Sequence, residues 1–551
     1  MIYNTKPPQI AEFVNETYDC REENLNSLLE KISTIKELLS LDNDVPKHPI
    51  TKSFDYPSEL ANLSLSEDGR TSEDVLGDLK DMLAGSIRAN SELSFFNILT
   101  TPLLDTVAAN TMLNLYNSVV LMDAFGGKLL LYEQKVAHLM GNLIGWESAY
   151  GISCNGGKLT MLYALKSAIS KIAPEANREG IPKDMAVITN EGAHYSIEHV
   201  CAFLGLGSDR CFRVPCNDDW QMDQTALSHT IEKLHTKGLR VAAVICCAGT
   251  TINFVCDDIA QVFDTVNKSV KSLSLDYVPY IHVDSVIGWL WYSFLEQRGS
   301  DRLTEIDSSI VEQIEQVTQR LTGVHLADSF GIDFHKNGLC PFPTSFFVTK
   351  QFENFNRLTD GCYQLGEKDL RFGQLRPYRY TVENSRPATG IATAWIALQR
   401  LGITGLQSYL LKLKYVCLTF SDALDSLSLF EVLNRHTFGW EVVFSIQFSK
   451  LLQHYPSISE EVICNNFIEY LWEKVNHGEA LPLISIVPGY QAKASYPKRT
   501  AFLFFPMLHS LNNIKIHKAV GLLSEQVSMF EQAVCDGKLR LKNTQTERPI
   551  R

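Results

Sequence analysis

The stretch Ala327-Asp328-Ser329-Phe330-Gly331-Ile332-Asp333-Phe334-His335-Lys336 points most strongly to both fold and function. Lys336 follows a histidine and several apolar residues, an unusual setting for a solvated lysine. A lysine removed from water becomes a nucleophile toward aldehydes, and enzymes use this to bind carbonyl cofactors. Because a lone lysine is far more often a solvated loop residue, Lys336 needs support from other parts of the chain.

Three features upstream of Lys336 each follow a predicted strand. Asp284 ends the apolar run 280–283, where a carboxylate can keep a pyridine nitrogen protonated and so make the ring an electron sink. His194 and the pair Thr250-Thr251 follow two further apolar runs. A histidine ring can stack on a cofactor, and a threonine hydroxyl can orient ring substituents. Taken singly, each residue is more often structural, as a cap, a turn residue or a packed histidine.

A fourth feature is Gly156-Gly157-Lys158, which opens an amphipathic helix predicted over 158–172. Two glycines allow close approach of the backbone to an anion, and the free N–H groups and dipole of a helix N-terminus favour negative charge. An isolated glycine pair more commonly makes a turn. The argument for a cofactor site depends on the order of these features along the chain, which is glycine pair, histidine, threonine pair, aspartate and finally lysine.

Helical segments alternate with short apolar runs from about 100 to 350, which is typical of an α/β domain with a mostly parallel sheet. Functional residues are then expected at strand ends. We predict an N-terminal helical arm over 1–95, a large α/β domain over 96–400 and a small C-terminal α+β domain over 401–551. The strands predicted in the large domain cover 185–189, 241–247, 280–283 and 345–348, and those in the small domain cover 441–448, 483–487 and 500–505.

Composition narrows the class of protein. The formal charge of -13 and the pI near 5.6 disfavour binding to nucleic acid or to an anionic membrane surface. The apolar runs are too short to span a bilayer, and the first residues lack the pattern of a signal peptide, so a cytoplasmic location is expected. Thirteen cysteines without any CxxC pair predict neither a disulfide framework nor a metal site.

With these residues in place, the sequence resembles the group II pyridoxal-phosphate-dependent amino-acid decarboxylases over roughly 90 to 405. The segment 327–336 is the most specific match, and His282-Val283-Asp284 matches a second motif of the family. The resemblance implies fold type I and a homodimer with its active sites at the interface. It also implies decarboxylation of an L-amino acid through a Schiff base on Lys336 and a quinonoid intermediate.

The resemblance assigns a role to each candidate residue. Lys336 would form the Schiff base with pyridoxal 5'-phosphate, Asp284 would pair with the pyridine nitrogen, and His194 would stack on the ring. Thr251 would lie near the ring substituents. The residues expected at the phosphate are Gly156, Gly157 and Lys158, with Ser329 and His335.

Substrate residues follow from the same resemblance. Phe96 and Asn97 lie in a segment similar to one that lines the substrate pocket, and Arg386 lies in an SR-containing turn. The acid that protonates the α-carbon is expected to be Tyr378 or Tyr380, with His194 as an alternative.

The sequence departs from the family pattern at several positions. Lys158 replaces a small or hydroxylated residue, Val286 replaces an alanine, and Leu93-Ser94 replaces the family's Pro-Arg pair. Three further functions therefore stay open within the fold: a carbon–carbon lyase, an oxidative decarboxylase that forms an aldehyde, and a non-catalytic relative that binds the cofactor. A regulatory nucleotide-binding protein that uses the glycine turn is the remaining alternative.

Overall fold

The structure is a computed structural model that describes residues 22–52, 54–61, 63–65, 67–295, 306–360 and 371–542. The chain divides into two compact units. One comprises Met1–Ser94 with Trp472–Leu481, and the other comprises Phe95–Leu471 with Pro482–Arg551. The predicted α/β architecture with a helical N-terminal arm is confirmed, and every predicted site residue lies in the second unit.

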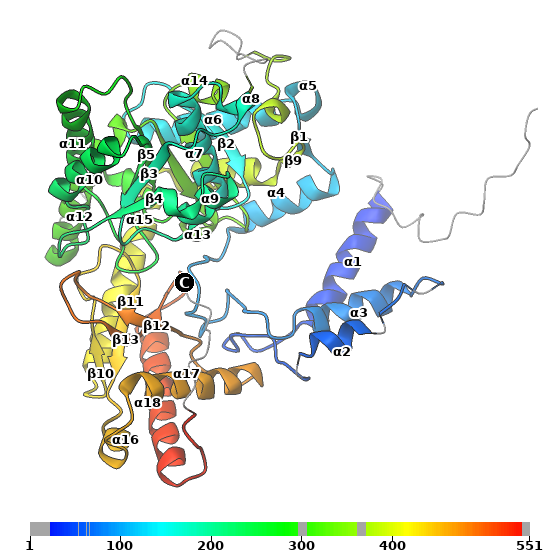
Figure 1. Ribbon diagram of the computed structural model, residues 1–551. Helices are drawn as coiled ribbons and strands as arrows, with labels where there is room; N and C mark the ends of the chain where they lie inside the picture. The colour runs from blue at the N-terminus through cyan, green and yellow to red at the C-terminus, as the bar shows by residue number, and fades with distance from the viewer. Residues whose placement is uncertain are drawn as a thin grey trace, which may run out of the picture. The chain divides into compact units, whose positions relative to one another are not determined.

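A seven-stranded sheet forms the centre of the second unit (Figure 1). Its strand order is β2-β8-β7-β6-β5-β3-β4. The five strands from β7 to β4 run parallel, whereas β8 is antiparallel to both β7 and β2. The strands are β2 (Tyr150–Cys154), β3 (Met185–Asn190), β4 (Cys211–Val214), β5 (Arg240–Cys247), β6 (Tyr280–Asp284), β7 (Ser329–Asp333) and β8 (Ser345–Thr349).

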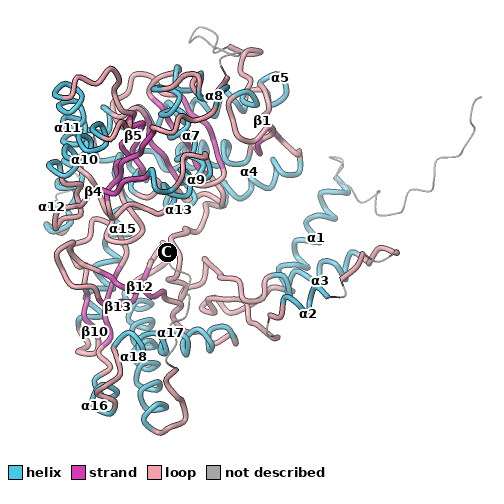
Figure 2. The backbone as a smooth tube through the Cα atoms, in the orientation of Figure 1, coloured by secondary structure: helices cyan, strands magenta, loops and turns pink. Residues whose placement is uncertain are grey.

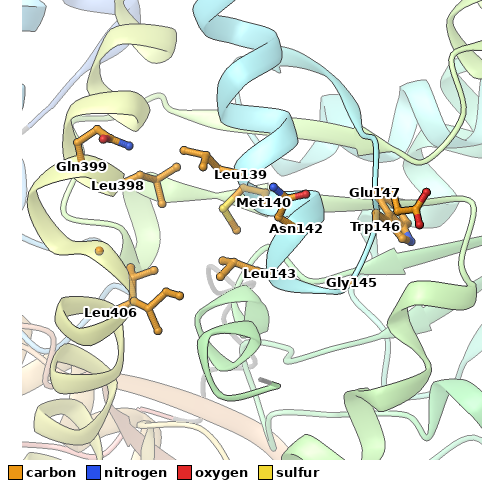
Figure 3. Close-up of a pocket in the computed structure, with 12 residues that line it drawn as sticks. Leu139, Met140, Asn142, Leu143, Gly145, Trp146, Glu147, Leu398, Gln399 and Leu406 are labelled. Carbon is orange, nitrogen blue, oxygen red and sulfur yellow. The ribbon is translucent and has the colours of Figure 1, made fainter. Parts of the chain in front are cut away.

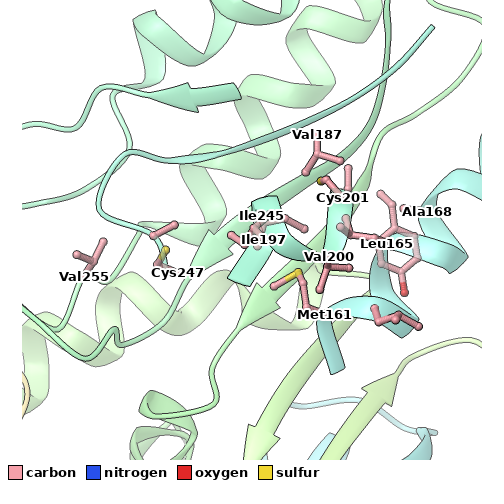
Figure 4. Close-up of a cluster of buried hydrophobic side chains, with 14 residues drawn as sticks. Met161, Leu165, Ala168, Val187, Ile197, Val200, Cys201, Ile245, Cys247 and Val255 are labelled. Atoms are coloured by element: carbon pink, nitrogen blue, oxygen red, sulfur yellow. The ribbon is translucent and has the colours of Figure 1, made fainter. Parts of the chain in front are cut away.

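The central strands β3 and β5 are mostly apolar and almost fully buried, so the sheet needs helices on both of its faces. Helix α7 runs across the sheet, and its side chains join those of α9, β3 and β5 in a buried cluster that includes Met161, Leu165, Ile197 and Ile245 (Figure 4). The helices of this region are α4 (Leu104–Leu115), α5 (Asp123–Gly126), α6 (Leu129–Leu143), α7 (Gly157–Ile172), α8 (Ala176–Glu179), α9 (Ser196–Phe203), α10 (Gln224–Thr236), α11 (Ile259–Ser272), α12 (Ser308–Leu321), α13 (Phe334–Asn337) and α14 (Glu353–Asn356). A short pair, β1 (Val119–Val120) with β9 (Arg386–Pro387), lies outside the main sheet.

Helix α15 (Thr389–Asp425) links the large sheet to the C-terminal part of the chain. It is two helices joined at Gly402, which has a φ of 56°. Beyond it, four antiparallel strands in the order β10-β11-β13-β12 form a second sheet, visible in magenta in Figure 2. The elements are β10 (Phe430–Val432), β11 (Val442–Ile446), β12 (Ser485–Tyr490), β13 (Arg499–Phe504), α16 (Ser449–His454), α17 (Glu460–Asn476) and α18 (Asn513–Cys535).

The first unit is built from short helices and few buried side chains. Its helices are α1 (Glu22–Leu38), α2 (Tyr56–Ala61) and α3 (Ser72–Met82), and α1 packs on α3. Lys47 Nζ donates to Asn476 Oδ1 at 2.5 Å, and Ile50 N donates to Asn476 O at 2.7 Å. These bonds join the end of α17 to the segment before α2.

Candidate functional site

The predicted site assembles at the carboxyl ends of neighbouring parallel strands. β6 ends at Asp284, and β7 beside it ends at Asp333 and leads into the single turn α13, which carries Lys336. Asn337 Nδ2 donates to Ile287 O and so ties α13 to the segment that follows β6. In open α/β sheets this edge is where ligands bind, so the topology brings Lys336 and Asp284 into one site.

Lys336 is held by a carboxylate that sequence analysis did not single out. Lys336 Nζ lies 3.0 Å from Asp333 Oδ2, and Ser345 Oγ donates to Asp333 Oδ1 at 2.6 Å. His335 Nε2 lies 3.7 Å from the same Oδ2. Burial opposes ionisation of Asp333, but Lys336, His335 and the bond from Ser345 together hold the pKa of Asp333 below its usual value. The spacing Asp-x-x-Lys was the sequence signal available for this pair.

Asp284 has a different environment. Its carboxylate accepts a long hydrogen bond of 3.4 Å from Val286 N. Desolvation raises the pKa of Asp284 to about 6, although the charge of Lys336 opposes the rise. A carboxylate that loses hydration without a close cation gains most from a cationic partner, and a protonated pyridine nitrogen would be one.

The glycine pair lies at the N-terminus of the sixteen-residue helix α7. Gly156 has a φ of 105°, a conformation that favours glycine. A Cβ on Gly157 would lie 2.9 Å from Val286 Cγ1 and 3.0 Å from Asp333 Oδ2, so only glycine fits there without a shift of its neighbours. Lys158 is exposed, and its Nζ lies 3.2 Å from His199 Nδ1. The Val286 that departs from the family pattern therefore packs directly against the predicted phosphate turn.

His194 follows β3, and its Nδ1 accepts a hydrogen bond from Ser196 N at 3.2 Å. Burial, together with the charges of Lys336, Lys158 and Arg213, lowers the pKa of His194 to about 4. The imidazole is therefore neutral at pH 7. Lys336 and Lys158 are close enough to His194 to influence its charge, and the predicted stacking of His194 on the cofactor ring stays a prediction.

Asp257 and Asn190 connect the loops after β3 and β5, and neither was found by sequence reasoning. Asp257 is buried and accepts hydrogen bonds from Asn190 Nδ2 at 2.8 Å and from Met222 N and Cys247 N, both at 2.7 Å. Asn190 Oδ1 accepts from Gly192 N at 2.7 Å. The pair thus fixes the turn that leads to His194. No local pattern reveals it, because the partners are 67 residues apart.

The two residues of the threonine pair have different environments. Thr250 Oγ1 donates to Ile252 O and accepts from Val255 N, so Thr250 closes its own turn. Thr251 is partly buried beside it. The predicted contact of Thr251 with the cofactor stays a prediction.

Ser329 and His335 lie at opposite ends of β7. Ser329 is at the start of the strand, about 13 Å from its end, and its Oγ lies 2.8 Å from His282 Nδ1 within the core. His335 is buried beside Asp333, and Thr344 N donates to its Nδ1 at 3.2 Å. The position of His335 supports a place next to the cofactor, whereas that of Ser329 gives its predicted role no support.

The segment with Phe96 and Asn97 passes close to α13. Thr100 N donates to His335 O at 3.5 Å, and Leu103 N donates to Leu339 O at 2.9 Å. Asn97 Oδ1 accepts from Leu99 N, which shapes the segment locally. Both predicted substrate residues are partly buried, within a few residues of these contacts.

Arg386 is buried in an ion pair, with its Nη1 2.6 Å from Glu133 Oε1, and it also donates to Ser153 O at 2.8 Å. Its charge is already balanced inside the protein. Tyr380 stacks on Phe355 with a centroid distance of 5.3 Å, whereas Tyr378 is partly exposed and lies beside Arg379. The structure therefore places Arg386 in β9 and the two tyrosines in the segment before it, and their predicted substrate and acid roles stay predictions.

A separate cavity of about 500 Å³ lies between α6 and α15 (Figure 3). Leu139, Met140 and Leu143 of α6 face Leu398 and Leu406 of α15 across it. It contains none of the predicted site residues.

Within the ranges that the structure describes, no group of three or more His, Cys, Asp or Glu residues is arranged to hold a metal ion.

The donor set fits pyridoxal phosphate. The site offers an amine for the aldehyde, a desolvated carboxylate for the ring nitrogen, a neutral imidazole for the ring face and a helix N-terminus for the phosphate. No helix of the described residues is long and apolar enough to cross a membrane.

Comparisons with known proteins agree with this site. Residues 55–307 match the model of the pyridoxal-dependent decarboxylase conserved domain, a range that includes Gly157, His194 and Asp284 but ends before Lys336. The chain is similar in structure to mouse CSAD, with a TM-score of 0.73, 18% identity and coverage of 93% of this chain and 99% of that one.

Two plant structures are also similar. Oryza sativa TDC with PLP and tryptamine has a TM-score of 0.71 and 15% identity, and the match covers 96% of this chain and all of that one. Rhodiola rosea 4-hydroxyphenylacetaldehyde synthase has a TM-score of 0.69 and 13% identity over 96% and 100% of the two chains. Residues 55–307 therefore match the pyridoxal-dependent decarboxylase conserved domain, and the whole chain is similar in fold to these solved structures.

Proposed function

We propose that this protein is an amino-acid decarboxylase that releases carbon dioxide from the α-carboxylate of an L-amino acid, with pyridoxal phosphate bound to Lys336. One observation carries the proposal: Asp284 ends β6, Lys336 lies in the turn α13 that follows the adjacent parallel strand β7, and Gly157 of α7 lies against Val286 and Asp333. The matched domain includes the aspartate, the histidine and the glycine turn. The matched range ends before Lys336, and the position of this lysine directly after β7 supports its proposed role.

When bound, pyridoxal phosphate supplies an electron sink for the pair of electrons left by carbon dioxide. Asp284 would hold a proton on the ring nitrogen, and the N-terminus of α7 would take the phosphate. His194 is neutral at pH 7 and mostly buried, so it suits the ring face, where it excludes water without adding charge.

The acid that protonates the α-carbon is a separate choice. A histidine with a pKa of about 4 carries little proton at pH 7. Tyr380 is buried against Phe355, whereas Tyr378 lies in an accessible turn. We therefore favour Tyr378. Because Arg386 is paired with Glu133, we propose that it shapes the substrate site through this ion pair and does not bind the substrate directly.

We further propose a homodimer. Helix α4 has a single buried residue, Thr106, and exposes the apolar side chains of Leu104 (85%), Val107 (39%) and Met112 (37%). Exposed apolar side chains grouped on one element are typical of an interface.

A cytoplasmic location agrees with the eleven cysteines that the structure describes, all of which are free.

The test is a panel of L-amino acids incubated with the purified holoenzyme, with carbon dioxide, amine, aldehyde and hydrogen peroxide measured together. Equal amounts of carbon dioxide and amine from one amino acid are expected. Aldehyde with peroxide would replace the proposal by oxidative decarboxylation, and Tyr378→Phe would then leave the product unchanged. Cofactor binding without any product would favour a non-catalytic relative.

A further inference from the structure

Asp333 occupies a position where an aspartate normally caps a helix, yet it caps nothing. It is the N-cap residue of α13, with φ -118° and ψ 99°, and its side chain makes no cap hydrogen bond. An aspartate in this position ordinarily accepts from a backbone N–H of the first turn. Here the carboxylate turns toward Lys336, so its orientation serves another purpose.

The contacts of Asp333 leave its two oxygens with different partners. Oδ1 accepts from Ser345 Oγ at 2.6 Å, and Oδ2 lies 3.0 Å from Lys336 Nζ. The aspartate side chain is 2% exposed, whereas that of the lysine is 20% exposed. Ser345 belongs to β8, which pairs with β7 across Asp333 itself. The carboxylate is therefore fixed by the sheet, and the lysine reaches to it from the more open side.

We propose that Asp333 is the acid–base partner of Lys336: it orients the ammonium group in the cofactor-free protein and takes its proton when the lysine attacks an aldehyde. This inference rests on the proposed role of Lys336 as the cofactor lysine.

The proton balance follows from the contact. An ammonium group has no lone pair, so Nζ must lose a proton before it forms a bond to a carbonyl carbon. Asp333 Oδ2 is within hydrogen-bond reach and accepts that proton. Nζ then bonds to the aldehyde carbon and the carbonyl oxygen leaves as water. In the reverse direction, the neutral Asp333 returns the proton to the released amine.

A purely structural ion pair makes a different prediction. Asp328 and Lys171 form such a pair before the first residue of β7, with an Nζ–Oδ1 distance of 3.3 Å and both side chains about one-fifth exposed. If Asp333 only supported β7, its loss would change stability but leave the reactivity of Lys336 in the folded protein unchanged. The reactivity of the lysine separates the two readings.

The experiment uses cofactor-free full-length protein treated at pH 7 with formaldehyde and cyanoborohydride, which methylate an uncharged amine. Methylation of the Lys336 peptide is followed by mass spectrometry. In Asp333→Asn, which keeps the size of the side chain, Lys336 is expected to react at least about tenfold more slowly, because the group that takes its proton during the attack is gone. Asp328→Asn is the matched control and should leave the Lys336 rate unchanged.

A rate within twofold of wild type, or a faster one, in folded Asp333→Asn would overturn the proposal. If that variant lacks a cooperative unfolding transition, Asp333→Glu decides: methylation as fast as in wild type supports the proposal, and methylation at least tenfold slower overturns it. A tenfold fall in Asp333→Asn together with no pyridoxal phosphate on Lys336 in wild type would support the acid–base pair while refuting the proposed cofactor role.

Discussion

Two aspartates end adjacent strands of the same sheet, and their ionisation is perturbed in opposite directions. Asp333, at the end of β7, is the more buried, yet its pKa is lowered. Asp284, at the end of β6, is partly exposed, and its pKa is raised to about 6. Burial alone would order them the other way. The difference comes from partners: Asp333 has Lys336 and Ser345, whereas Asp284 has one long bond to Val286 N.

This contrast assigns separate tasks to the two carboxylates. Asp333 already has its cation in the cofactor-free protein, whereas Asp284 lacks a close one until a ligand provides it. Each of the following predictions tests one side of the comparison.

The largest effect is expected at Asp284. Asp284→Asn keeps the shape but cannot hold a proton on a ring nitrogen by charge, so kcat for decarboxylation should fall by about 10²- to 10³-fold. Steady-state kinetics on the substrate identified by the amino-acid panel measure this. Asp328→Asn serves as the control and should retain wild-type kcat. An Asp284→Asn enzyme within threefold of wild type would remove Asp284 from the mechanism.

The same residue should make the stability of the cofactor-free protein depend on pH. A carboxyl group whose pKa rises on folding binds a proton more tightly in the folded state, so its stabilising contribution is lost as pH rises from about 4 to about 6. We expect a loss of about 2 to 3 kcal/mol, reduced for partial exposure. Urea unfolding at several pH values should show this loss in wild type and not in Asp284→Asn; equal profiles would contradict it.

Ser345 tests how firmly the sheet holds Asp333. Ser345→Ala removes a hydrogen bond to a buried, charged acceptor and should lower the free energy of unfolding by about 2 kcal/mol. Ser285→Ala is a matched control, because Ser285 is also buried but donates to the neutral Gly331 O, at 2.7 Å. Its expected cost is about 1 kcal/mol. Equal losses in chemical denaturation would mean that Asp333 is not charged.

Gly157 tests the narrow space between the two strand ends. Gly157→Ala places a methyl group against Val286 and Asp333, and we expect pyridoxal phosphate to bind about tenfold more weakly. Val286→Ala removes one of the two obstructions, so the double variant should recover part of the affinity in a fluorescence titration. Unchanged binding in Gly157→Ala would place the phosphate elsewhere.

Much of this arrangement was predictable because the signals are local. The strands predicted over 241–247 and 280–283 agree with β5 and β6, and the helix predicted over 158–172 agrees with α7. β7 was not predicted as a strand, since Ser329–Asp333 mixes polar residues and glycine in only five positions. Its burial between β6 and β8 comes from tertiary pairing, which local propensity does not report.

The site was predictable to the extent that each residue follows its own strand. The partnership of Lys336 with Asp333 depends on the turn of α13, and the bond between Asn190 and Asp257 joins two distant loops. The ion pair of Arg386 with Glu133 spans 253 residues of sequence. Such contacts arise only when the chain folds, so the sequence alone offered a substrate role for Arg386 and no role for Asp257.

The central claim is that Lys336 holds the cofactor, and borohydride reduction of the purified holoenzyme tests it most directly. Reduction should remove the visible absorbance band and leave a pyridoxyl group on the Lys336 peptide, identified by mass spectrometry, and Lys336→Ala should show neither. A pyridoxyl group on another lysine, or no band after addition of pyridoxal phosphate to wild-type protein, would contradict the account.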